Sequence, residues 1–285
     1  MNICRFLLIS GYLLLFPHPT PLLSEPTEGK LKTLYNSLNP YSVSQHLAFY
    51  ELYGDTPLGK QALKDAWQLL VGPQSILETT AQKEIPLSQT SVQALISLVN
   101  KPMDQETILL DNASLDSLSA ISQRLPHNRL KGHHVWTEEE VLALPLQEVD
   151  LARGLFISQF GQDRKKILSY EALIDLMALQ ILARFPSNAT SEDKISVINS
   201  FIFDEMGFRF PPHSLYAKDI DLYTFLPSVL DSRRGVCLGV SILYICLAQR
   251  LSLNLEVVTP PGHIFVRYRA GNQVINIETT ARGIS

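Results

Sequence analysis

The chain has 285 residues, of which 46% are apolar and 18% are charged, so it can bury a sizeable core as one large domain or two ordinary ones. Its formal net charge is -4, and no basic stripe with interleaved aromatic residues occurs in it. This charge pattern argues against nucleic acid as the main partner.

The N-terminal segment has the three parts of a secretory signal peptide. Arg5 supplies a positive charge, residues 6–16 form a mostly apolar run, and Pro17 ends that run ahead of a candidate cleavage site at 22–24. The run is shorter than the roughly 20 apolar residues that a membrane-spanning helix needs. We therefore predict that residues 1–24 direct export, which in a bacterium means the periplasm or the outside of the cell. An uncleaved N-terminal anchor and a buried N-terminal helix are the alternatives, and no second segment reads as transmembrane.

Residues 25–130 are predicted to form a helical region that follows a short tail at 25–35. Leucine and isoleucine recur there at spacings of three and four, which is typical of helices with one apolar face. Thr56 is an expected N-cap, and Ser114 is expected to cap the last helix of the region. The expected helices span residues 42–71 with a break at 54–57, residues 88–100, and residues 114–123.

A polar segment at 124–136, interrupted by a proline and a glycine, is predicted to link this region to the next. It contains His127, His133 and His134, which raise the possibility of a metal site. Zinc-binding histidines usually lie on a regular element with a further ligand nearby. These three lie in an irregular segment without a nearby cysteine, so a solvated loop is the favoured interpretation. We predict no metal and no other cofactor.

Residues 137–285 are predicted to form the second domain. Thr137 is followed three residues later by Glu140, and this pair is typical of a capping box at a helix start. Gly207 is expected to end the third helix of the domain. The expected helices span residues 138–161, 168–185 and 192–206, and the last is capped by Thr190 or Ser191.

A further helix is predicted from Cys237 to about residue 251, and it is apolar on nearly every side, as in a helix buried within its domain. Cys237 falls in its first turn, where the peptide dipoles and free N–H groups favour a thiolate. Gly235, just before it, allows close approach of the backbone. Cys246 lies roughly 13 Å further along the helix, whereas the Cα atoms of a disulfide lie about 4.4–6.8 Å apart. The two cysteines cannot pair, and Cys246 is best explained as a core residue.

Three short strands are predicted after this helix, at residues 255–258, 263–268 and 274–279, with a turn at 269–272 between the last two. His263 begins the second of these strands, directly after Pro260-Pro261-Gly262, and Glu278 lies near the end of the third.

The length of the hairpin loop decides whether His263 and Glu278 meet. A two-residue loop at Ala270-Gly271, or a four-residue loop over 269–272, places them directly opposite each other, with Cβ atoms about 4.5–5.5 Å apart. A two-residue loop at Gly271-Asn272 places them on a diagonal of the same face. A three-residue loop would put them on opposite faces, because a slip of one residue reverses every side chain. Most short turns therefore bring the two residues together.

Cysteine, histidine and carboxylate in this order match a thiol nucleophile, its base and the group that orients the base. Taken singly, a core cysteine, an exposed histidine and a surface glutamate are each the commoner explanation. Their joint occurrence favours Cys237, His263 and Glu278 as a catalytic triad, and the backbone N–H of Cys237 is a candidate oxyanion donor.

Several segments from residue 150 to residue 283 resemble the bacterial SirB-type branch of the transglutaminase-like superfamily. The segments that carry the resemblance are DLARGLFI at 150–157, INSFIFDEMGF at 198–208, FLPSVL at 225–230, RG at 234–235, SILY at 241–244, LAQRL at 247–251 and PGHIFVR at 261–267. The resemblance implies an α+β, papain-like fold for residues 137–285, with a central helix packed on a small antiparallel sheet. It supplies no substrate.

The chain departs from this branch at the candidate nucleophile. Typical SirB-type members have a proline-containing segment after the Arg-Gly pair and no nucleophilic cysteine there. This sequence has Cys237, as catalytic members of the wider superfamily do, and Glu278 where aspartate is common. We expect an exported thiol-dependent acyl-transfer enzyme, either an amidase or peptidase or a transamidase, that acts on peptide or protein amides. The alternative is a non-catalytic transglutaminase-like fold that serves as a protein-interaction module.

Overall fold

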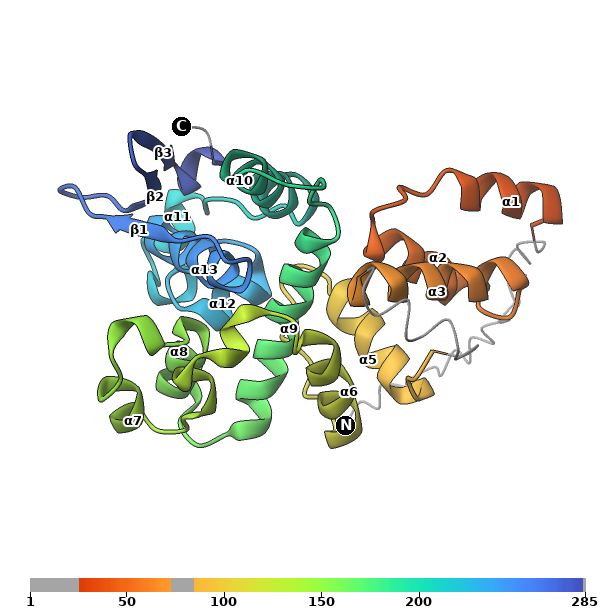
Figure 1. The fold of residues 1–285 in the computed structure, drawn as a ribbon, viewed down its shortest axis with the longest axis horizontal. Helices are drawn as coiled ribbons and strands as arrows, with labels where there is room; N and C mark the ends of the chain where they lie inside the picture. The colour runs from red at the N-terminus through yellow and green to blue at the C-terminus, as the bar shows by residue number, and fades with distance from the viewer. Residues whose placement is uncertain (1–25, 73–84, 284–285) are drawn as a thin grey trace, which may run out of the picture.

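A computed structural model describes residues 26–72 and 85–283 of the chain (Figure 1). The predicted signal peptide at 1–24 and its cleavage site lie outside the described residues. Within the two described ranges, no helix combines the length and the apolar character needed to cross a membrane.

The N-terminal region is helical, as predicted, and Figure 1 shows α1, α2, α3 and α5 gathered on one side of α9. Its helices are α1 (Glu28–Asn36), α2 (Val43–Tyr53), α3 (Pro57–Val71), α5 (Gln89–Val99) and α6 (Asn112–Ser122). The break at 54–57 and the cap by Thr56, which accepts from the Gly59 N–H, are confirmed. The sequence explains these elements well because their apolar faces and caps are both local features.

Two predictions for this region were wrong. Residues 25–35 were expected to be a tail, but α1 forms there because Leu31 is buried against Phe49 and Ala62 of the α2–α3 pair. The last helix begins at Asn112, and its cap is Asp111, which accepts a hydrogen bond from the Ser114 N–H. Aspartate caps a helix as well as serine does, so the cap lies three residues earlier than expected.

The predicted linker at 124–136 is folded rather than solvated. It forms two 3-10 helices, η1 (Pro126–Arg129) and η2 (Lys131–His134). His127 is buried with 1% of its surface exposed, His133 is half-buried, and His134 is exposed. Gly132 is also buried, and a side chain at that position would collide with the backbone of Glu148 and Asp150. The segment therefore packs against the second half of the chain.

The second half begins with a group of helices that includes α9, the longest described helix. They are α7 (Glu138–Leu142), η3 (Leu146–Glu148), α8 (Leu151–Phe160), α9 (Arg164–Leu182) and α10 (Ser191–Asn199), followed by the π-helical turn η4 (Ser200–Glu205). The capping box of Thr137 and Glu140 is confirmed. The single helix expected at 138–161 was wrong, because Pro145 cannot donate a backbone hydrogen bond and the chain breaks there before Asp150 caps α8.

The remaining elements build the α+β part of the fold. They are α11 (His213–Tyr216), η5 (Asp221–Tyr223), α12 (Leu226–Ser232), α13 (Cys237–Arg250), β1 (Leu255–Val258), β2 (Phe265–Ala270), β3 (Gln273–Ile277) and η6 (Thr279–Ala281). The three strands form an antiparallel sheet in the order β1-β2-β3. Figure 1 shows α13 beside this sheet. The predicted central helix and the small sheet are confirmed.

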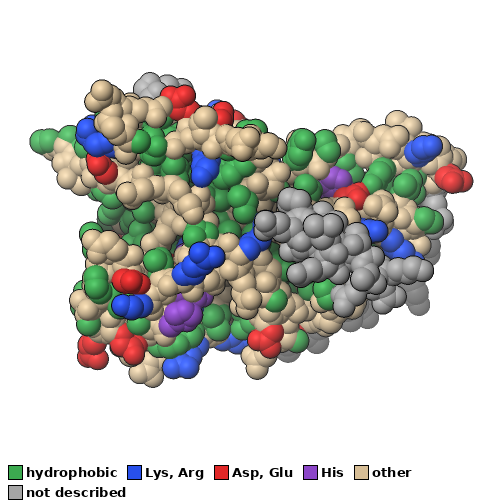
Figure 2. Space-filling view, viewed as in Figure 1, with side chains coloured by type: hydrophobic (Ala, Val, Ile, Leu, Met, Phe, Trp, Pro, Cys, Tyr) green, Lys and Arg blue, Asp and Glu red, His purple; other side chains and the backbone are tan. Residues whose placement is uncertain are grey.

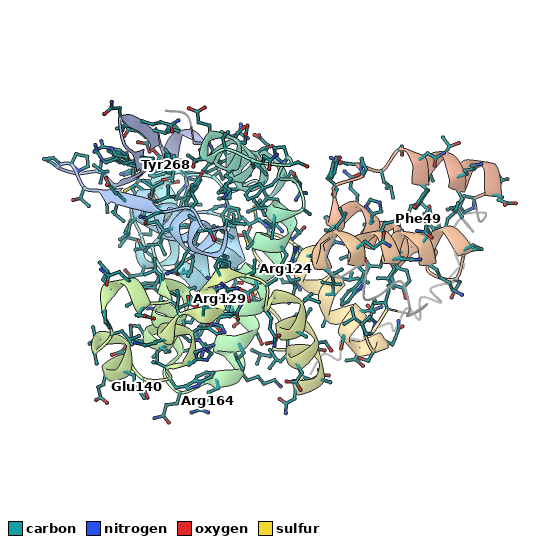
Figure 3. All side chains as sticks on the ribbon, viewed as in Figure 1. Phe49, Arg124, Arg129, Glu140, Arg164 and Tyr268 are labelled. Atoms are coloured by element: carbon teal, nitrogen blue, oxygen red, sulfur yellow. The ribbon has the colours of Figure 1, made fainter. Side chains whose placement is uncertain are left out.

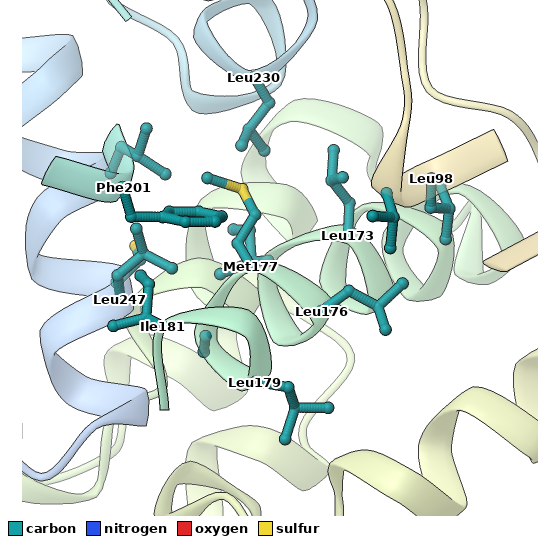
Figure 4. Close-up of a cluster of buried hydrophobic side chains, with 14 of the residues drawn as sticks. Leu98, Leu173, Leu176, Met177, Leu179, Ile181, Phe201, Leu230 and Leu247 are labelled. Carbon is teal, nitrogen blue, oxygen red and sulfur yellow. The ribbon is translucent and has the colours of Figure 1, made fainter. Parts of the chain in front are cut away.

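The buried core runs through most of the described chain. One apolar cluster extends from Val43 in α2 to Ile277 in β3. Figure 4 shows its centre, where Met177 and Ile181 of α9 lie near Phe201, Leu230 and Leu247 from three later elements. The division into a helical region at 25–130 and a domain at 137–285 stays a prediction, and this cluster includes residues on both sides of it.

The core-facing side of the sheet also contacts α10 at one end. Figure 3 labels Tyr268 on the sheet beside this helix, and the Tyr268 hydroxyl accepts a hydrogen bond of 2.7 Å from Ser191 Oγ at the start of α10. On the face of the molecule drawn in Figure 2, positive and negative side chains are mixed.

Candidate active site

Cys237 is the first residue of α13 and is half-buried. The N-cap residue is Val236, whose side chain cannot accept a hydrogen bond, and no described side chain caps this helix. Every other described helix of ten or more residues has a side-chain cap. The first-turn N–H groups of α13 are therefore left for another acceptor, and the positive end of the helix dipole faces it. A thiolate or an oxyanion suits this position.

The turn before Cys237 is held by close backbone contacts. Gly235 donates its N–H to the Arg209 carbonyl, and Val236 donates to the Tyr223 carbonyl at 2.8 Å. A Cβ on Gly239 would lie 2.4 Å from that same Tyr223 oxygen. The first turn of α13 thus packs directly on η5, and only glycine fits there. The predicted need for glycine at Gly235 is explained by packing against Val240, since a Cβ there would lie 2.8 Å from the Val240 side chain.

His263 is positioned by the turn that precedes it. Its N–H donates to the Pro260 carbonyl at 3.1 Å, and Gly262 has a φ of 76°. Proline at the second position and glycine with a positive φ at the third are the requirements of a type II turn. Pro261-Gly262 therefore fixes the direction in which His263 leaves the turn, two residues before β2 begins.

Glu278 lies directly after β3 and its carboxylate is held on both sides. Oε2 lies 2.6 Å from His263 Nε2, and Oε1 accepts from both the backbone N–H and the hydroxyl of Thr280 at 3.1 and 2.6 Å. Partial burial raises the pKa of Glu278, but the bonds from Thr280 and His263 outweigh this, and the pKa lies below its usual range. The carboxylate is therefore ionised and fixed in orientation.

The hairpin has the register that places the pair on a diagonal. Ala270 pairs with Gln273, so the loop is Gly271-Asn272, and Val266 pairs with Ile277. His263 and Glu278 are therefore not directly opposite each other. They lie on a diagonal, which keeps both side chains on one face of the hairpin. Since His263 and Glu278 both lie just beyond the paired residues, they meet at the open end of the hairpin. The sequence prediction that they come together is confirmed.

The segment that carries Glu278 contacts the face of α13 that carries Cys237. Ser241 lies one helical turn after Cys237, so the two residues share a face. Ser241 Oγ lies 3.1 Å from the hydroxyl of Thr279, the residue next to Glu278. Both hydroxyls are buried, which shows that η6 packs closely on α13. His263 Nε2 is used by Glu278, so Nδ1 is the ring nitrogen left to take a thiol proton.

Cys246 does not take part in this arrangement. It is fully buried in the middle of α13, and burial raises the pKa of its thiol to about 12. Cys237 and Cys246 are both free thiols, as the helix geometry predicted. The interpretation of Cys246 as a core residue is confirmed.

Several residues of this site were missed in the sequence. Thr280 could have been found, because a threonine two residues after a carboxylate often bonds to it in a local turn. Ser241 and Thr279 gave no signal, since their contact joins a helix to a segment 38 residues later in the chain.

A second missed feature is the loop at 101–107, which supports the turn before Cys237. Arg234 donates two bonds to Asp104 at 2.7 and 2.8 Å, and Lys101 forms an ion pair of 3.4 Å with Asp231 at the end of α12. These partners lie about 130 positions apart, so no local pattern could have revealed them.

Comparison with known proteins gives one match, and it lies in the C-terminal part of the chain. No curated protein and no solved structure matches the chain. A family model described as Transglutaminase-like superfamily matches residues 169–284, a stretch that contains Cys237, His263 and Glu278. The SirB-type branch stays a prediction. The match, the central helix and the three-stranded antiparallel sheet are consistent with an α+β, transglutaminase-like fold in this part of the chain.

Proposed function

We propose that the protein is a thiol-dependent acyl-transfer enzyme with Cys237, His263 and Glu278 as its catalytic residues. The observation that carries the proposal is the His263–Glu278 pair of 2.6 Å, whose neighbour Thr279 contacts Ser241 on the face of α13 that carries Cys237. A superfamily match over residues 169–284 supports the same class of chemistry.

The proposed reaction begins when His263 takes the thiol proton and the Cys237 sulfur attacks an amide carbonyl carbon. The carbonyl oxygen becomes an oxyanion, which the Cys237 N–H and the helix start can stabilise. The tetrahedral intermediate collapses when the C–N bond breaks, and the histidine returns its proton to the leaving amine. The product on the enzyme is a thioester. Water or a second amine then attacks it and releases an acid or a new amide.

Glu278 orients the imidazole and stabilises its charged form during both steps. We propose peptide or protein amides as the substrate class, because thiol attack through a histidine base suits a carboxamide or peptide carbonyl. Export of the protein, and cell-wall peptides as substrates in an exported bacterial protein, follow only from the predicted signal at 1–24 and are part of this proposal.

Acylation of the thiol by an activated ester tests the proposal without knowledge of the substrate. The full chain is mixed with p-nitrophenyl acetate, and the mass of the intact protein and of its peptides is followed. We expect one acetyl group per chain, bound to Cys237 as a thioester, and a slow steady release of further nitrophenolate. Cys237→Ser should prevent the modification. His263→Ala keeps the thiol and should slow the acylation by about 100-fold or more, as loss of a general base does.

The non-catalytic alternative gives a different result. Wild type and His263→Ala would then acylate at the same slow rate as an ordinary thiol, and no turnover would follow. That result would reject the proposed enzyme and leave the interaction module.

A further inference from the structure

A group of metal-ligating side chains lies in the folded segment that follows α6. One ring nitrogen each of His127 and His133 and one carboxylate oxygen of Asp150 lie within 4.8 Å of one another. His127 and Asp150 are each 1% exposed, while His133 is half-buried. Figure 3 labels Arg129 of η1 near the centre of the molecule, where this segment meets the core helices.

The spacing inside the group suits ligands on one ion. His133 Nδ1 lies 3.1 Å from Asp150 Oδ2. With metal–ligand bonds of about 2.0–2.1 Å, the edge of a tetrahedral zinc site is about 3.3 Å. The distance between His133 Nδ1 and Asp150 Oδ2 therefore suits two neighbouring ligands of one zinc ion, and it equally suits a hydrogen bond. The ring nitrogen of His127 would have to move by about an ångström or more to bind the same ion.

The burial of His127 is not explained by hydrogen bonds. Among the described residues, neither of its ring nitrogens has an aligned hydrogen-bond partner, although Nε2 approaches Asp175 Oδ1 to 3.3 Å. A buried imidazole whose ring nitrogens have no hydrogen-bond partner destabilises the folded state. A neutral imidazole has one ring nitrogen with a lone pair that can bind a metal ion. A metal ion would give that lone pair a partner.

The charged side chains around the group have a net negative charge, which favours a bound cation. Asp150 and Asp175 contribute two negative charges, and the fully buried Arg250 contributes one positive charge. Arg250 is bound mainly by Asp175, with Nε 2.6 Å from Oδ1, and its Nη1 lies 3.7 Å from Oδ1 of Asp150. Asp150 Oδ1 also caps α8, which leaves Oδ2 directed toward the histidines. One negative charge is uncompensated if both imidazoles are neutral.

We propose that His127, His133 and Asp150 bind one Zn²⁺-type transition-metal ion, with Asp175 orienting His127 from outside the coordination shell. Ligating histidines commonly direct their second ring nitrogen toward a carboxylate, as the approach of His127 to Asp175 suggests. The ion joins the 3-10 segment to α8 and so has a structural role. It lies near the C-terminal end of α13, about 20 Å from Cys237 at the other end, and takes no part in the thiol chemistry.

Metal binding by the full chain tests this proposal directly. The protein carries Cys237→Ser so that the thiolate cannot bind the ion, and it is stripped with a chelator and dialysed. Zn²⁺ is then titrated by calorimetry and Co²⁺ by visible absorption, since four-coordinate cobalt has an intense visible spectrum. His134→Ala is the matched control, because His134 is adjacent to the group but exposed. Asp150→Asn keeps an oxygen that can cap α8 but removes the anionic ligand.

The expected result is one saturable equivalent of metal per chain and an intense cobalt spectrum. His133→Ala and Asp150→Asn should each weaken binding by more than the 10–100-fold that loss of an outer-shell partner causes, whereas His134→Ala binds as the parent does. Circular dichroism confirms that each variant is folded, and an unfolded variant is replaced by His133→Gln. Absence of stoichiometric binding by the parent, or equal binding by the His133 and His134 variants, would overturn the proposal.

Discussion

Replacement of Asp231 by alanine should destabilise the protein more than any other change in the support of the Cys237 turn. The Asp231 carboxylate accepts hydrogen bonds from the N–H and hydroxyl of Thr107 at 3.0 and 2.7 Å and from the Tyr170 hydroxyl at 2.5 Å. It also pairs at 3.4 Å with Lys101, whose side chain is 4% exposed. The residue thus joins the 101–107 loop to the end of α12, just ahead of the turn to α13.

The size of the effect follows from the charge that the change leaves behind. Removing one partner of a buried ion pair costs about 3–5 kcal/mol, because the other charge stays buried without compensation. Asp231 itself is 20% exposed, so water can reach the site and the lower end of that range applies, about 3 kcal/mol. This is a large part of the roughly 5–15 kcal/mol that stabilises a typical native protein.

Urea denaturation at neutral pH measures the effect, with Asp104→Asn as the control. Asp104 also makes a two-bond contact, with Arg234, but its side chain is 51% exposed, so we expect a loss of about 1 kcal/mol or less. The reasoning is refuted if Asp231→Ala lowers the free energy of unfolding by no more than Asp104→Asn does. Unequal slopes of the two unfolding curves would require the comparison to be made by thermal melting instead.

Three further predictions concern the helix and the pair beside it. Gly239→Ala should lower the free energy of unfolding by about 1–3 kcal/mol, because its Cβ would lie 2.4 Å from a backbone oxygen; an unchanged melting temperature would contradict the packing of α13 on η5. Cys246, with its pKa raised to about 12 by burial, should resist iodoacetamide in the native protein and react in urea, as peptide mass spectrometry would show. The lowered pKa of Glu278 means that the unfolded chain binds a proton first as pH falls. Its stabilising effect is therefore complete above about pH 4.3 and is lost as pH falls through the folded-state pKa. Glu278→Gln should accordingly lose less stability between about pH 5 and pH 3 than wild type does. If urea denaturation at several pH values shows the same loss of unfolding free energy in both proteins, the result argues against an ionised Glu278.

Local sequence patterns predicted the elements that bear the candidate triad. The helix from Cys237 begins where expected, because a long apolar run follows that residue. The strand at Leu255–Val258 also lies where expected, because a turn with proline and glycine follows it. The pairing of His263 with Glu278 also followed from the sequence, since most short hairpin loops bring them to one face.

The errors arose where distant contacts override a local pattern. The 124–136 segment is polar and contains a proline and a glycine, yet His127 is buried because Asp150 and Asp175 lie beside it in the fold. Those carboxylates are 23 and 48 positions away, and only the packing of α8 and α9 shows that they meet. The same limit applies to the bond between Asp104 and Arg234.

Iodoacetamide labelling of Cys237 as a function of pH tests the central claim most directly. If His263 activates the thiol, wild type should be labelled rapidly near about pH 6, well below the pKa of about 8.5 of a free cysteine. His263→Ala should lose this labelling while remaining folded. If wild type and His263→Ala are both labelled only above about pH 8, as a free thiol is, Cys237 is not an activated nucleophile and the proposed enzyme mechanism is wrong.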